Sequence, residues 1–328
     1  MSAPLKVAVV GGTGGWGEQH VRIFSGRDDT DLVGIVGRTP ERVQQRAAAY
    51  GTTGYTSIEE MLEEGRPDLV TTSLPNEAHF EPTLELIRAG VPLLVEKPLV
   101  FSVAEADRLI DEAAERELFF AINFNHRYAE AVQLAHRAIQ AGELGEIVHA
   151  TWRFGGEANP GENPYRNLFE TQCHGFDMLE HLAGPITSVM AQMSNLTDAA
   201  AYHTMAIAVQ FANGGVGSLL GSYDTSYAYP DTQYIEVNGT RGRAVIRDTV
   251  QELILSTAGD ETHRVWRPGY FNDTDRTFTH TFDRHVDALL AALRAGEPPP
   301  IHASAGRRAV ELGEASVRSF EQGVRVDT

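Results

Sequence analysis

The sequence has one cysteine, fewer basic than acidic residues and no long apolar run. Because a single cysteine, Cys173, allows no disulfide within the chain, the composition fits a reducing compartment, and we expect a cytoplasmic protein. No stretch approaches the ~20 apolar residues that a membrane-spanning helix needs. The apolar segment Leu5–Val10 is too short for the core of a signal peptide and leads straight into glycines, so we expect a strand there.

Positive charge is scarce, since 27 Lys and Arg residues face 45 Asp and Glu residues, which gives a net charge of −18. An acidic surface repels phosphate backbones and anionic lipids, so neither a nucleic acid nor a membrane surface is expected as a partner. An anionic cofactor would have to be held by local donors. The length of 328 residues suggests two domains, and the 42% hydrophobic content suffices for a full core.

The first third of the chain alternates strand and helix signals. Strands are expected at Leu5–Val10, Asp31–Val36, Leu69–Thr72, Val91–Val95 and Phe119–Phe124. Helices are expected at Glu18–Ser25, Pro40–Tyr50, Ser57 to about Gly65, Phe80–Ala89 and Ser102 to about Arg116, two of them opened by the capping boxes Ser57/Glu60 and Ser102/Glu105. This alternation implies right-handed βαβ units, so we expect residues 1–124 to form a Rossmann domain with a doubly wound parallel sheet.

Residues 125–328 show a different pattern, in which most strands follow one another without helices. After a helix at Ala129–Ala141, a strand at Ile147–Phe154, a loop at Gly155–Asn167 and a helix at Glu170–Ala183, we expect strands at Thr204–Phe211, Gly217–Tyr223, Gln233–Asn238, Arg243–Arg247, Glu252–Ser256 and His263–Trp266, and helices at Phe282–Arg294 and Ala305–Gln322. This predicts an α+β domain with an open, mostly antiparallel sheet. Whether the final helix packs back between the domains stays open.

A glycine-rich turn follows the first expected strand. Gly12, Gly14 and Gly17 fit the pattern G-x-G-x-x-G between a strand and a helix. In this pattern the first glycine allows the tight turn, the second lets the backbone approach a pyrophosphate, and the third lets helix and strand pack closely. Free N–H groups at the helix N-terminus then bind the phosphates. The turn alone is weak evidence, but with the surrounding βαβ units it predicts a dinucleotide cofactor.

The end of the second strand bears on which dinucleotide binds. NAD enzymes usually carry Asp or Glu there to hold the ribose diol. This chain has Gly37-Arg38-Thr39 instead, and an arginine with a hydroxyl suits a 2′-phosphate. We therefore favour NADP(H) over NAD(H), with the alternative that Arg38 stacks on adenine or lies in solvent.

Several further segments resemble one family. They are Ser73–His79, Glu96-Lys97-Pro98, Asn123–Tyr128 and the glycine turn followed by His20. Together they resemble the glucose–fructose oxidoreductase/inositol dehydrogenase (Gfo/Idh/MocA) family, over nearly the whole chain to the helix at Ala309–Phe320. The resemblance implies a Rossmann domain, a second domain whose open sheet often mediates oligomers, and oxidation or reduction of a carbinol or ketone carbon of sugars, inositols and related polyols. We therefore expect a homodimer or homotetramer formed through the C-terminal sheet.

With this resemblance, the residues expected at the cofactor can be named. They are Gly12, Thr13, Gly14, Gly15, Trp16, Gly17, Arg38, Thr39, Ser73, Leu74, Pro75, Asn76, His79, Glu96, Lys97 and Asn125. For Trp16 a surface packing role competes evenly with covering the cofactor, and for His79 a capping role competes with positioning the cofactor edge.

Lys97 is the first catalytic candidate. It ends a parallel strand, where ligands of doubly wound folds bind. A lysine beside a nicotinamide that becomes cationic gives up its proton more easily and can exchange it with a substrate hydroxyl. In the family the matching lysine is catalytic. The alternative is a surface lysine in a strand-end turn, which the neighbouring Glu96 and Pro98 disfavour.

His174 is the second catalytic candidate. Offsets of four and three place Glu170, His174 and Asp177 on one face of the expected helix, where a carboxylate can orient the imidazole. In the family an Asp-x-x-x-His-x-x-Asp pattern serves substrate binding and proton transfer. Here Glu170 replaces the first aspartate and Gln172 replaces a usual glycine, so the role of Glu170 stays open. The alternative is a helix histidine paired with a carboxylate for stability.

Other side chains are expected on the substrate side. Arg127 either binds a substrate oxygen or forms an internal ion pair, and Tyr128 lines the same cleft as Asn125. Tyr165 and Arg166 in the polar loop are further candidates for substrate contact. No metal is expected, although Glu170, His174, Asp177 and His181 share a helical face. Cys173 adjoins His174 but points about 100° away on a helix, so a Cys–His dyad is not expected.

The sequence thus predicts an NAD(P)-dependent dehydrogenase or ketoreductase acting on a sugar, cyclitol or related polyol. Two alternatives remain. The cofactor could be recycled in place during an elimination or glycosidic cleavage, or the protein could be a non-catalytic dinucleotide sensor that binds a protein partner.

Overall fold

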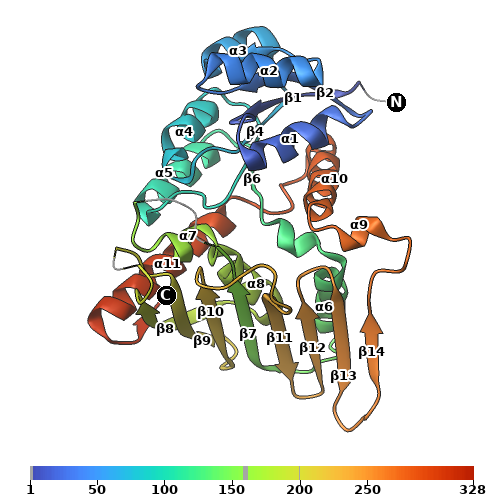
Figure 1. Cartoon of the computed structure of the whole chain (residues 1–328), viewed down its shortest axis with the longest axis vertical. Helices are drawn as coiled ribbons and strands as arrows, with labels where there is room; N and C mark the ends of the chain where they lie inside the picture. Colours follow the sequence, from blue (N-terminus) through green and yellow to red (C-terminus); the bar gives the residue numbers. More distant parts are fainter. Residues whose placement is uncertain (1–2, 158–161, 199) are drawn as a thin grey trace. The chain divides into compact units, whose positions relative to one another are not determined.

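The fold is described from a computed structural model, which describes residues 3–157, 162–198 and 200–328. The chain divides into two compact units, one of Met1–Asn123 with Val286–Arg307 and one of Phe124–His285 with Arg308–Thr328. The first division lies one residue before the expected boundary at 124/125. Val286–Arg307, expected in the second domain, is instead counted with the first unit. Figure 1 shows both units, with labels on most of the elements described below.

The first unit contains a parallel sheet of six strands. Its strands are β1 (Leu5–Val10), β2 (Thr30–Val36), β3 (Gly54–Tyr55), β4 (Leu69–Thr72), β5 (Leu93–Val95) and β6 (Phe120–Ile122). Their order is β3-β2-β1-β4-β5-β6, and every adjacent pair is parallel. The strand order therefore reverses between β1 and β4, the point at which doubly wound sheets bind dinucleotides. The predicted Rossmann sheet is confirmed.

The helices of this sheet begin close to where the sequence predicts. They are α1 (Gly15–Ser25), α2 (Pro40–Tyr50), α3 (Ile58–Gly65), the 3₁₀ turn η1 (Asn76–Ala78), α4 (Phe80–Arg88) and α5 (Val103–Ala114). Both predicted N-caps are present, since the Ser57 hydroxyl accepts a hydrogen bond from the Glu60 N–H (3.4 Å) and Ser102 accepts one from Glu105 (3.3 Å). Helix α1 starts three residues earlier than expected, at Gly15, so it begins inside the glycine turn.

A late segment of the chain completes the first unit. Val286–Arg307 comprises most of α10 (His280–Ala295) and the beginning of α11 (Ser304–Gln322). Its carbonyl at Ile301 accepts a hydrogen bond from the N–H of Ile122 (3.1 Å), and the N–H of Ala303 donates to the carbonyl of Phe120 (2.9 Å). The segment thus pairs with β6, the last strand of the sheet.

The second unit is built on a sheet of nine strands. They are β7 (Ile147–Gly155), β8 (Ile186–Ser194), β9 (Thr204–Phe211), β10 (Val216–Ser222), β11 (Gln233–Gly239), β12 (Gly242–Arg247), β13 (Glu252–Thr257), β14 (His263–Trp266) and β15 (Val326–Asp327). The order is β14-β13-β12-β11-β7-β10-β9-β8-β15, and only the β7–β10 pair is parallel. The open, mostly antiparallel sheet is confirmed, with β8 and β15 as additional strands.

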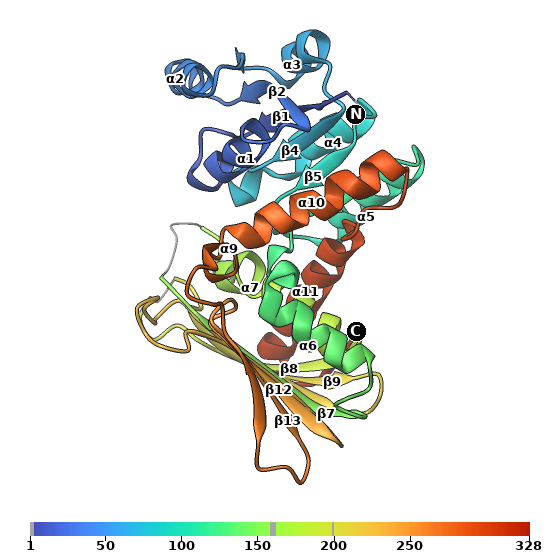
Figure 2. The ribbon, with the colours of Figure 1, turned by 90° about the vertical axis from the view of Figure 1, so that its right-hand side faces the viewer.

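Helices cover one face of this sheet. The second unit contains the 3₁₀ turn η2 (Asn125–Tyr128), α6 (Glu130–Gln140), α7 (Arg166–Glu170), α8 (Cys173–Ala183) and α9 (Asp273–Arg276). Helix α8 packs on β7 and α6 packs on β12 and β13. Figure 2 shows that the described helices lie on one side of the sheet, whereas its other face is open. The covered side is apolar, with Trp152, Ile207 and Leu219 buried on it.

One element differs from the prediction at a place that matters for function. The prediction of a continuous helix over Glu170–Ala183 is wrong, because α7 ends at Glu170 and α8 begins at Cys173. Part of the expected loop Gly155–Asn167, residues 158–161, lies outside the described residues. In the described part of the chain, no helix is both long and apolar enough to cross a bilayer.

Candidate dinucleotide site and catalytic residues

A cavity of about 770 Å³ lies in the first unit, at the carboxyl ends of β1, β2 and β4. Its volume is within the range of ~300–1,000 Å³ that is typical of small-molecule sites. Nine residues expected at the cofactor line it, namely Thr13, Gly14, Gly15, Trp16, Arg38, Thr39, Ser73, Leu74 and Pro75. The sequence analysis missed the other lining residues, among them Gly11 and Arg42. Arg42 is the third residue of α2.

The glycine turn has the shape that a pyrophosphate requires, with one change of role. The residue in the left-handed conformation is Gly11 (φ +86°), not Gly12, and a Cβ at Gly11 would lie 2.0 Å from the carbonyl oxygen of Ser73. Gly12 faces inward, where a Cβ would meet Ile35 and Val21. At Gly15, the first residue of α1, a Cβ would meet nothing within 4 Å. The start of α1 therefore opens into the cavity, as diphosphate binding needs.

Two exposed guanidinium groups lie after the end of β2 and in the first turn of α2. Arg38 and Arg42 both line the cavity and are exposed, and among the described residues neither forms an ion pair. Thr39, also at the cavity, is the residue before α2. The segment Gly37-Arg38-Thr39 contains no acidic residue that could accept hydrogen bonds from a ribose diol. This part of the cavity wall therefore carries two cations and a hydroxyl.

Glu96 connects the glycine turn to the end of β5. Its carboxylate is buried, and its Oε1 accepts hydrogen bonds from Trp16 Nε1 (2.7 Å) and Asn123 Nδ2 (2.6 Å) and lies 2.9 Å from His20 Nε2. Burial alone would raise the pKa of Glu96, but the contacts with His20, Lys97 and Asn123 outweigh it and hold that pKa below its usual value. Glu96 does not line the cavity. It holds Trp16, which does, and bonds the backbone of Lys97.

Lys97 lies directly after β5, at the same end of the sheet as the glycine turn. Its backbone N–H donates to Glu96 Oε2 (3.3 Å), and the Lys97–Pro98 peptide bond is cis. The Pro98 carbonyl oxygen lies 2.7 Å from His79 Nδ1, and that of Leu74 lies 3.0 Å from His79 Nε2. His79 is buried, which lowers its pKa. It therefore joins the Lys97–Pro98 turn to the cavity wall at Leu74 rather than lining the cavity.

The expected cofactor residues outside the cavity wall have other surroundings. Gly17 packs against the turn, where a Cβ would lie 2.2 Å from the carbonyl oxygen of Gly11. Asn76 begins the η1 turn after Pro75. Asn125 belongs to the second unit, where its amide donates to Thr281 Oγ1 (2.8 Å).

In the second unit, His174 lies in a cluster of aromatic rings. Its ring centroid is 4.2 Å from that of His126 and 5.6 Å from that of Phe124. His126 is itself 5.9 Å from Trp152 and 5.0 Å from Phe278. Both histidines are buried. The sequence analysis missed His126, although it lies inside the Asn123–Tyr128 segment, because nothing in the sequence shows that this ring faces His174.

Asp177 and Arg127 form a bidentate ion pair within the second unit. Arg127 Nε and Nη2 donate to the two carboxylate oxygens of Asp177 at 2.9 and 2.5 Å. Burial would lower the pKa of Arg127, but the Asp177 carboxylate raises it above its usual value, so the guanidinium stays charged. Of the two roles left open for Arg127, the structure contains the internal ion pair. Asp177 was expected on the substrate side, and its carboxylate is already bonded to Arg127.

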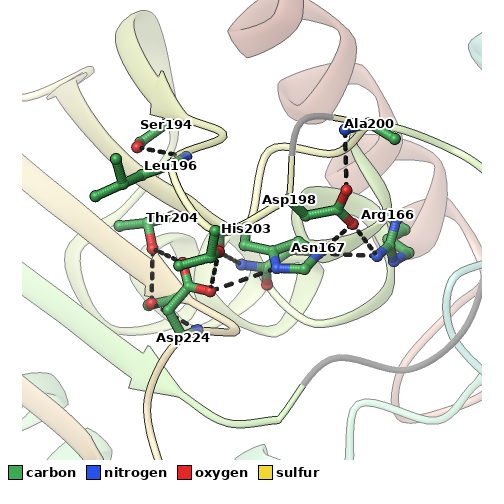
Figure 3. Close-up of polar contacts among 11 residues, drawn as sticks. Arg166, Asn167, Ser194, Leu196, Asp198, Ala200, His203, Thr204 and Asp224 are labelled. Carbon is green, nitrogen blue, oxygen red and sulfur yellow. Dashed lines mark hydrogen bonds and ion pairs between the residues drawn. The ribbon is translucent and has the colours of Figure 1, made fainter.

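Arg166 and His203 are buried at the centre of a polar network that reaches the partly exposed carboxylates of Asp198 and Asp224 (Figure 3). Arg166 Nη2 donates to His203 Nε2 (2.8 Å) and lies 3.4 Å from Asp198 Oδ2, while His203 Nδ1 lies 3.4 Å from Asp224 Oδ1. Arg166 is only 7% exposed. The expectation that Arg166 lies in a polar loop is wrong, because Arg166 begins α7, and its guanidinium is bonded within this network.

Tyr165 and Glu170, at the two ends of α7, also have partners within the unit. The Tyr165 ring stacks on Tyr202, and its hydroxyl donates to Glu321 (2.9 Å). Glu170 is buried beside Tyr223, whose hydroxyl shares a hydrogen bond with Thr171 (2.6 Å). Because the helix is interrupted between Glu170 and Cys173, Glu170 and His174 do not lie on one continuous helix as the sequence analysis expected.

The structure also shows the surroundings of His181, Cys173 and Tyr128. His181 does not join Glu170, His174 and Asp177, since its Nε2 lies 2.7 Å from His136 Nδ1. No group of three or more His, Cys, Asp or Glu residues within the described ranges could hold a metal ion. Cys173 is buried and free of disulfides. Tyr128, expected at the cleft, stacks on His285 with ring centroids 4.7 Å apart.

The strand order, the glycine turn and the cavity together define an oxidoreductase with an NAD-binding Rossmann fold. Residues 5–124 match the model of the "Oxidoreductase family, NAD-binding Rossmann fold", and residues 132–245 match that of the "GFO/IDH/MocA C-terminal domain". The chain belongs to the Gfo/Idh/MocA family of oxidoreductases, as the resemblance implied.

Similar proteins align over nearly the whole chain. A myo-inositol 2-dehydrogenase of Thermotoga maritima is 24% identical over 97% of both chains. A D-xylose 1-dehydrogenase (NADP(+)) of Haloferax volcanii is 24% identical over 96% of this chain and 98% of that protein. The structure of a levoglucosan dehydrogenase in complex with NADH and levoglucosan has a TM-score of 0.88 at 20% identity, covering 99% of both chains. The last of these shows the fold.

Proposed function

We propose that this enzyme oxidises a carbinol carbon, or reduces the corresponding ketone, of a sugar, cyclitol or related polyol with a nicotinamide dinucleotide. The observation that carries the proposal is the cavity at the glycine turn together with Lys97 at the end of β5, on the same edge of the parallel sheet. The names of the similar proteins, an inositol and a xylose dehydrogenase, support the substrate class.

The backbone of the glycine turn would hold the dinucleotide phosphates. The N–H groups at the start of α1 have no helical partners, and the open space at Gly15 lets phosphate oxygens reach them. Ser73, Leu74 and Pro75 form the opposite wall of the cavity. When bound, the nicotinamide supplies the hydride acceptor or donor.

Lys97 would carry the proton that balances hydride transfer. In the oxidative direction its amine takes the proton of the substrate hydroxyl at Nζ, and in the reductive direction its ammonium returns it. Glu96 and His79 hold the backbone on either side of Lys97, through the Lys97 N–H and the Pro98 carbonyl. His174 would be a second group for binding and proton transfer, and Glu170, Tyr165 and Asp177 further residues on the substrate side. The partners of Arg127 and Arg166 favour a supporting role for both.

We further propose that NADP(H) is preferred over NAD(H). Arg38 and Arg42 offer two unpaired guanidinium groups, within the described part of the chain, at the cavity end of β2 and in α2. A 2′-phosphate is the ligand that such a pair binds well, because guanidinium–phosphate hydrogen bonds are charge-assisted.

The setting proposed for the enzyme follows from composition and from the second sheet. A single cysteine and a net charge of −18 favour a cytoplasmic enzyme that avoids nucleic acids and membranes. The uncovered face of β8, β9 and β10 carries small or uncharged side chains such as Ala206, Ala208, Ser218 and Leu220. Such a face favours association with a second copy, so we propose a homodimer or homotetramer.

The decisive experiment replaces Lys97, which is one of only two lysines in the sequence. Lys97→Met is expected to lower kcat by about 10²- to 10⁴-fold on a panel of polyols, because the proton acceptor is lost. Cofactor affinity, measured by fluorescence titration, is expected to change little. The matched control is Lys6→Met, at an exposed residue near the start of β1, which should leave both unchanged.

Two results would contradict the proposal. Turnover within a few-fold of wild type in Lys97→Met would remove Lys97 from the reaction. Binding of the cofactor without any turnover of polyols by the wild-type protein would instead point to a dinucleotide sensor.

A further inference from the structure

Gln172 lies at the break between α7 and α8, two residues before His174, and is fully buried. Its side-chain amide is hydrogen-bonded on both sides. Gln172 Oε1 accepts from the indole N–H of Trp152 (2.9 Å), and Gln172 Nε2 donates to Asn167 Oδ1 (3.1 Å). A buried amide with both ends bonded is fixed in orientation, since rotating it would leave two polar groups without partners.

The hydrogen bonds continue from Asn167 to the network of Figure 3. Asn167 is fully buried, and its Nδ2 donates to the backbone carbonyl oxygen of His203 (2.6 Å). The carbonyl of Asn167 also accepts the N–H groups of Thr171 (3.1 Å) and Gln172 (3.0 Å). The backbone path from α7 to α8 is therefore set by Asn167 and Gln172 together.

Packing leaves no room for this arrangement to shift. A Cβ at Gly221 of β10 would lie 2.4 Å from Cδ of Gln172. A Cβ at Gly175 of α8 would lie 2.5 Å from Nε1 of Trp152. Both glycines allow direct contact of backbone and side chain, so the first turn of α8 packs on the Trp152 indole at the same Nε1 edge that is hydrogen-bonded to Gln172.

Trp152 also contacts the histidine pair. Its ring centroid lies 5.9 Å from that of His126, which in turn lies 4.2 Å from that of His174. The orientation of the Trp152 ring therefore limits where His126 can lie, and His126 limits His174. One hydrogen bond, between Gln172 and Trp152, acts on His174 through the backbone at Gly175 and through the ring of His126.

We propose that Gln172, together with Trp152, is a positioning residue that fixes the His126–His174 ring pair for the reaction. This inference rests on the proposed role of His174. Gln172 replaces a glycine that is usual in the family at this place, and a glycine could form neither hydrogen bond. We call the hydrogen-bonded pair of Gln172 and Trp152 the lock. The lock is particular to chains that have an amide side chain at this position, and it would adjust the geometry of the second unit independently of the cofactor.

The test uses the full-length enzyme and three variants of the lock. Gln172→Leu removes both hydrogen bonds at similar size, Gln172→Glu keeps the acceptor for Trp152, and Trp152→Phe keeps the ring but loses its N–H. The control is Thr249→Val, which removes the buried hydrogen bond from Thr249 to Gln233 (2.7 Å) near β11 and β12. His174 ring signals are identified in NMR spectra by their loss in His174→Asn.

Gln172→Leu is expected to lower kcat about tenfold with a smaller change in KM, and to move the pH profile of kcat and the ring signals of His174. Gln172→Glu should recover part of kcat, and Trp152→Phe should follow Gln172→Leu in direction even if the leucine variant folds poorly. Thr249→Val should reduce thermal stability and leave kcat, its pH profile and the His174 signals unchanged.

Unchanged His174 signals and an unchanged kcat in both Gln172→Leu and Trp152→Phe would overturn the inference. Failure of the proposed function gives a different pattern. In that case His174→Asn keeps full activity, while the His174 signals of Gln172→Leu still move and show that the lock positions the ring.

Discussion

At the scale of single residues, two glycines in the same turn have opposite constraints. Gly11 has φ +86° and no space for a Cβ, whereas Gly15 begins α1 and faces open space. Gly11→Ala is expected to destabilise the protein by roughly 2–4 kcal/mol, because alanine avoids this φ and would meet the Ser73 carbonyl. Gly15→Ala should keep or slightly raise stability but weaken dinucleotide binding, since its methyl group projects toward the phosphates.

Chemical denaturation and cofactor titration of both variants check this pair. Equal stability of Gly11→Ala and wild type would contradict the prediction that the turn has no room for a side chain at Gly11. Unchanged cofactor affinity in Gly15→Ala would place the phosphates elsewhere in the cavity.

Arg38 and Arg42 allow a residue-scale test of cofactor choice. Each single alanine substitution is expected to raise KM for NADPH about 10- to 100-fold with little change for NADH, because one charge-assisted contact to a 2′-phosphate is lost. Arg46→Ala is the control on the same helix, since Arg46 is paired with Glu18 at 2.7 Å. A wild-type preference for NADH, or equal effects on both cofactors, would reject the assignment.

Residue types and spacing located the cofactor cavity but not the partners of the polar side chains. The G-x-G-x-x-G spacing located the turn, but the residue with positive φ is Gly11, one position before the first glycine of the pattern, because the pattern cannot distinguish neighbouring glycines. Arg166 looked like a loop residue, but its partners His203 and Asp198 lie more than 30 positions later. Such long-range pairs leave no periodic signal in a sequence.

At the scale of elements, α6 and α8 are joined by a pair of histidines. His136 Nδ1 lies 2.7 Å from His181 Nε2, and burial, with smaller contributions from Arg127 and His136, lowers the pKa of His181 to about 3. In the unfolded chain a histidine titrates near 6.5. Between these values the unfolded state binds more protons, so stability is highest above about pH 6.5 and is lost as the pH falls toward 3.

We expect the free energy of unfolding to drop by roughly 1–2 kcal/mol from pH 7.5 to 5 through this residue. Urea denaturation at several pH values measures it. His181→Gln should flatten the dependence in this range, whereas His263→Gln, an exposed histidine of β14, should not. An identical slope in His181→Gln and wild type would show that the pair is not the cause.

Element prediction succeeded where periodicity was strong and failed where the chain broke it. The six Rossmann strands and their helices were found within a few residues, apart from the two-residue β3. The break between α7 and α8 was missed because Glu170, His174 and Asp177 have helical spacing in the sequence. The hydrogen bond between Gln172 and Trp152, which lies at the break, is a long-range contact that this spacing does not reveal. Strand β8 was missed because its buried residues do not alternate regularly with exposed ones.

At the scale of the whole molecule, the first unit depends on two separate stretches of the chain. Ile301 and Ala303 pair with β6, which would otherwise be an unprotected edge strand. A fragment ending at Asn123 is therefore expected to aggregate, whereas 1–123 joined by a flexible linker to 286–307 should be soluble and bind the dinucleotide. Size-exclusion chromatography and circular dichroism distinguish the two. A monomeric, folded 1–123 fragment would show that the late segment is dispensable.

The interleaved order of the two units also bears on how the protein is made. Chains leave the ribosome from the N-terminus, and domains generally fold as soon as all of their residues have emerged. Here the first unit waits for Val286–Arg307, and the second unit ends only with Arg308–Thr328. For the time needed to translate more than half of the sequence, the nascent parallel sheet exposes β6, so both units mature almost together at the end of synthesis.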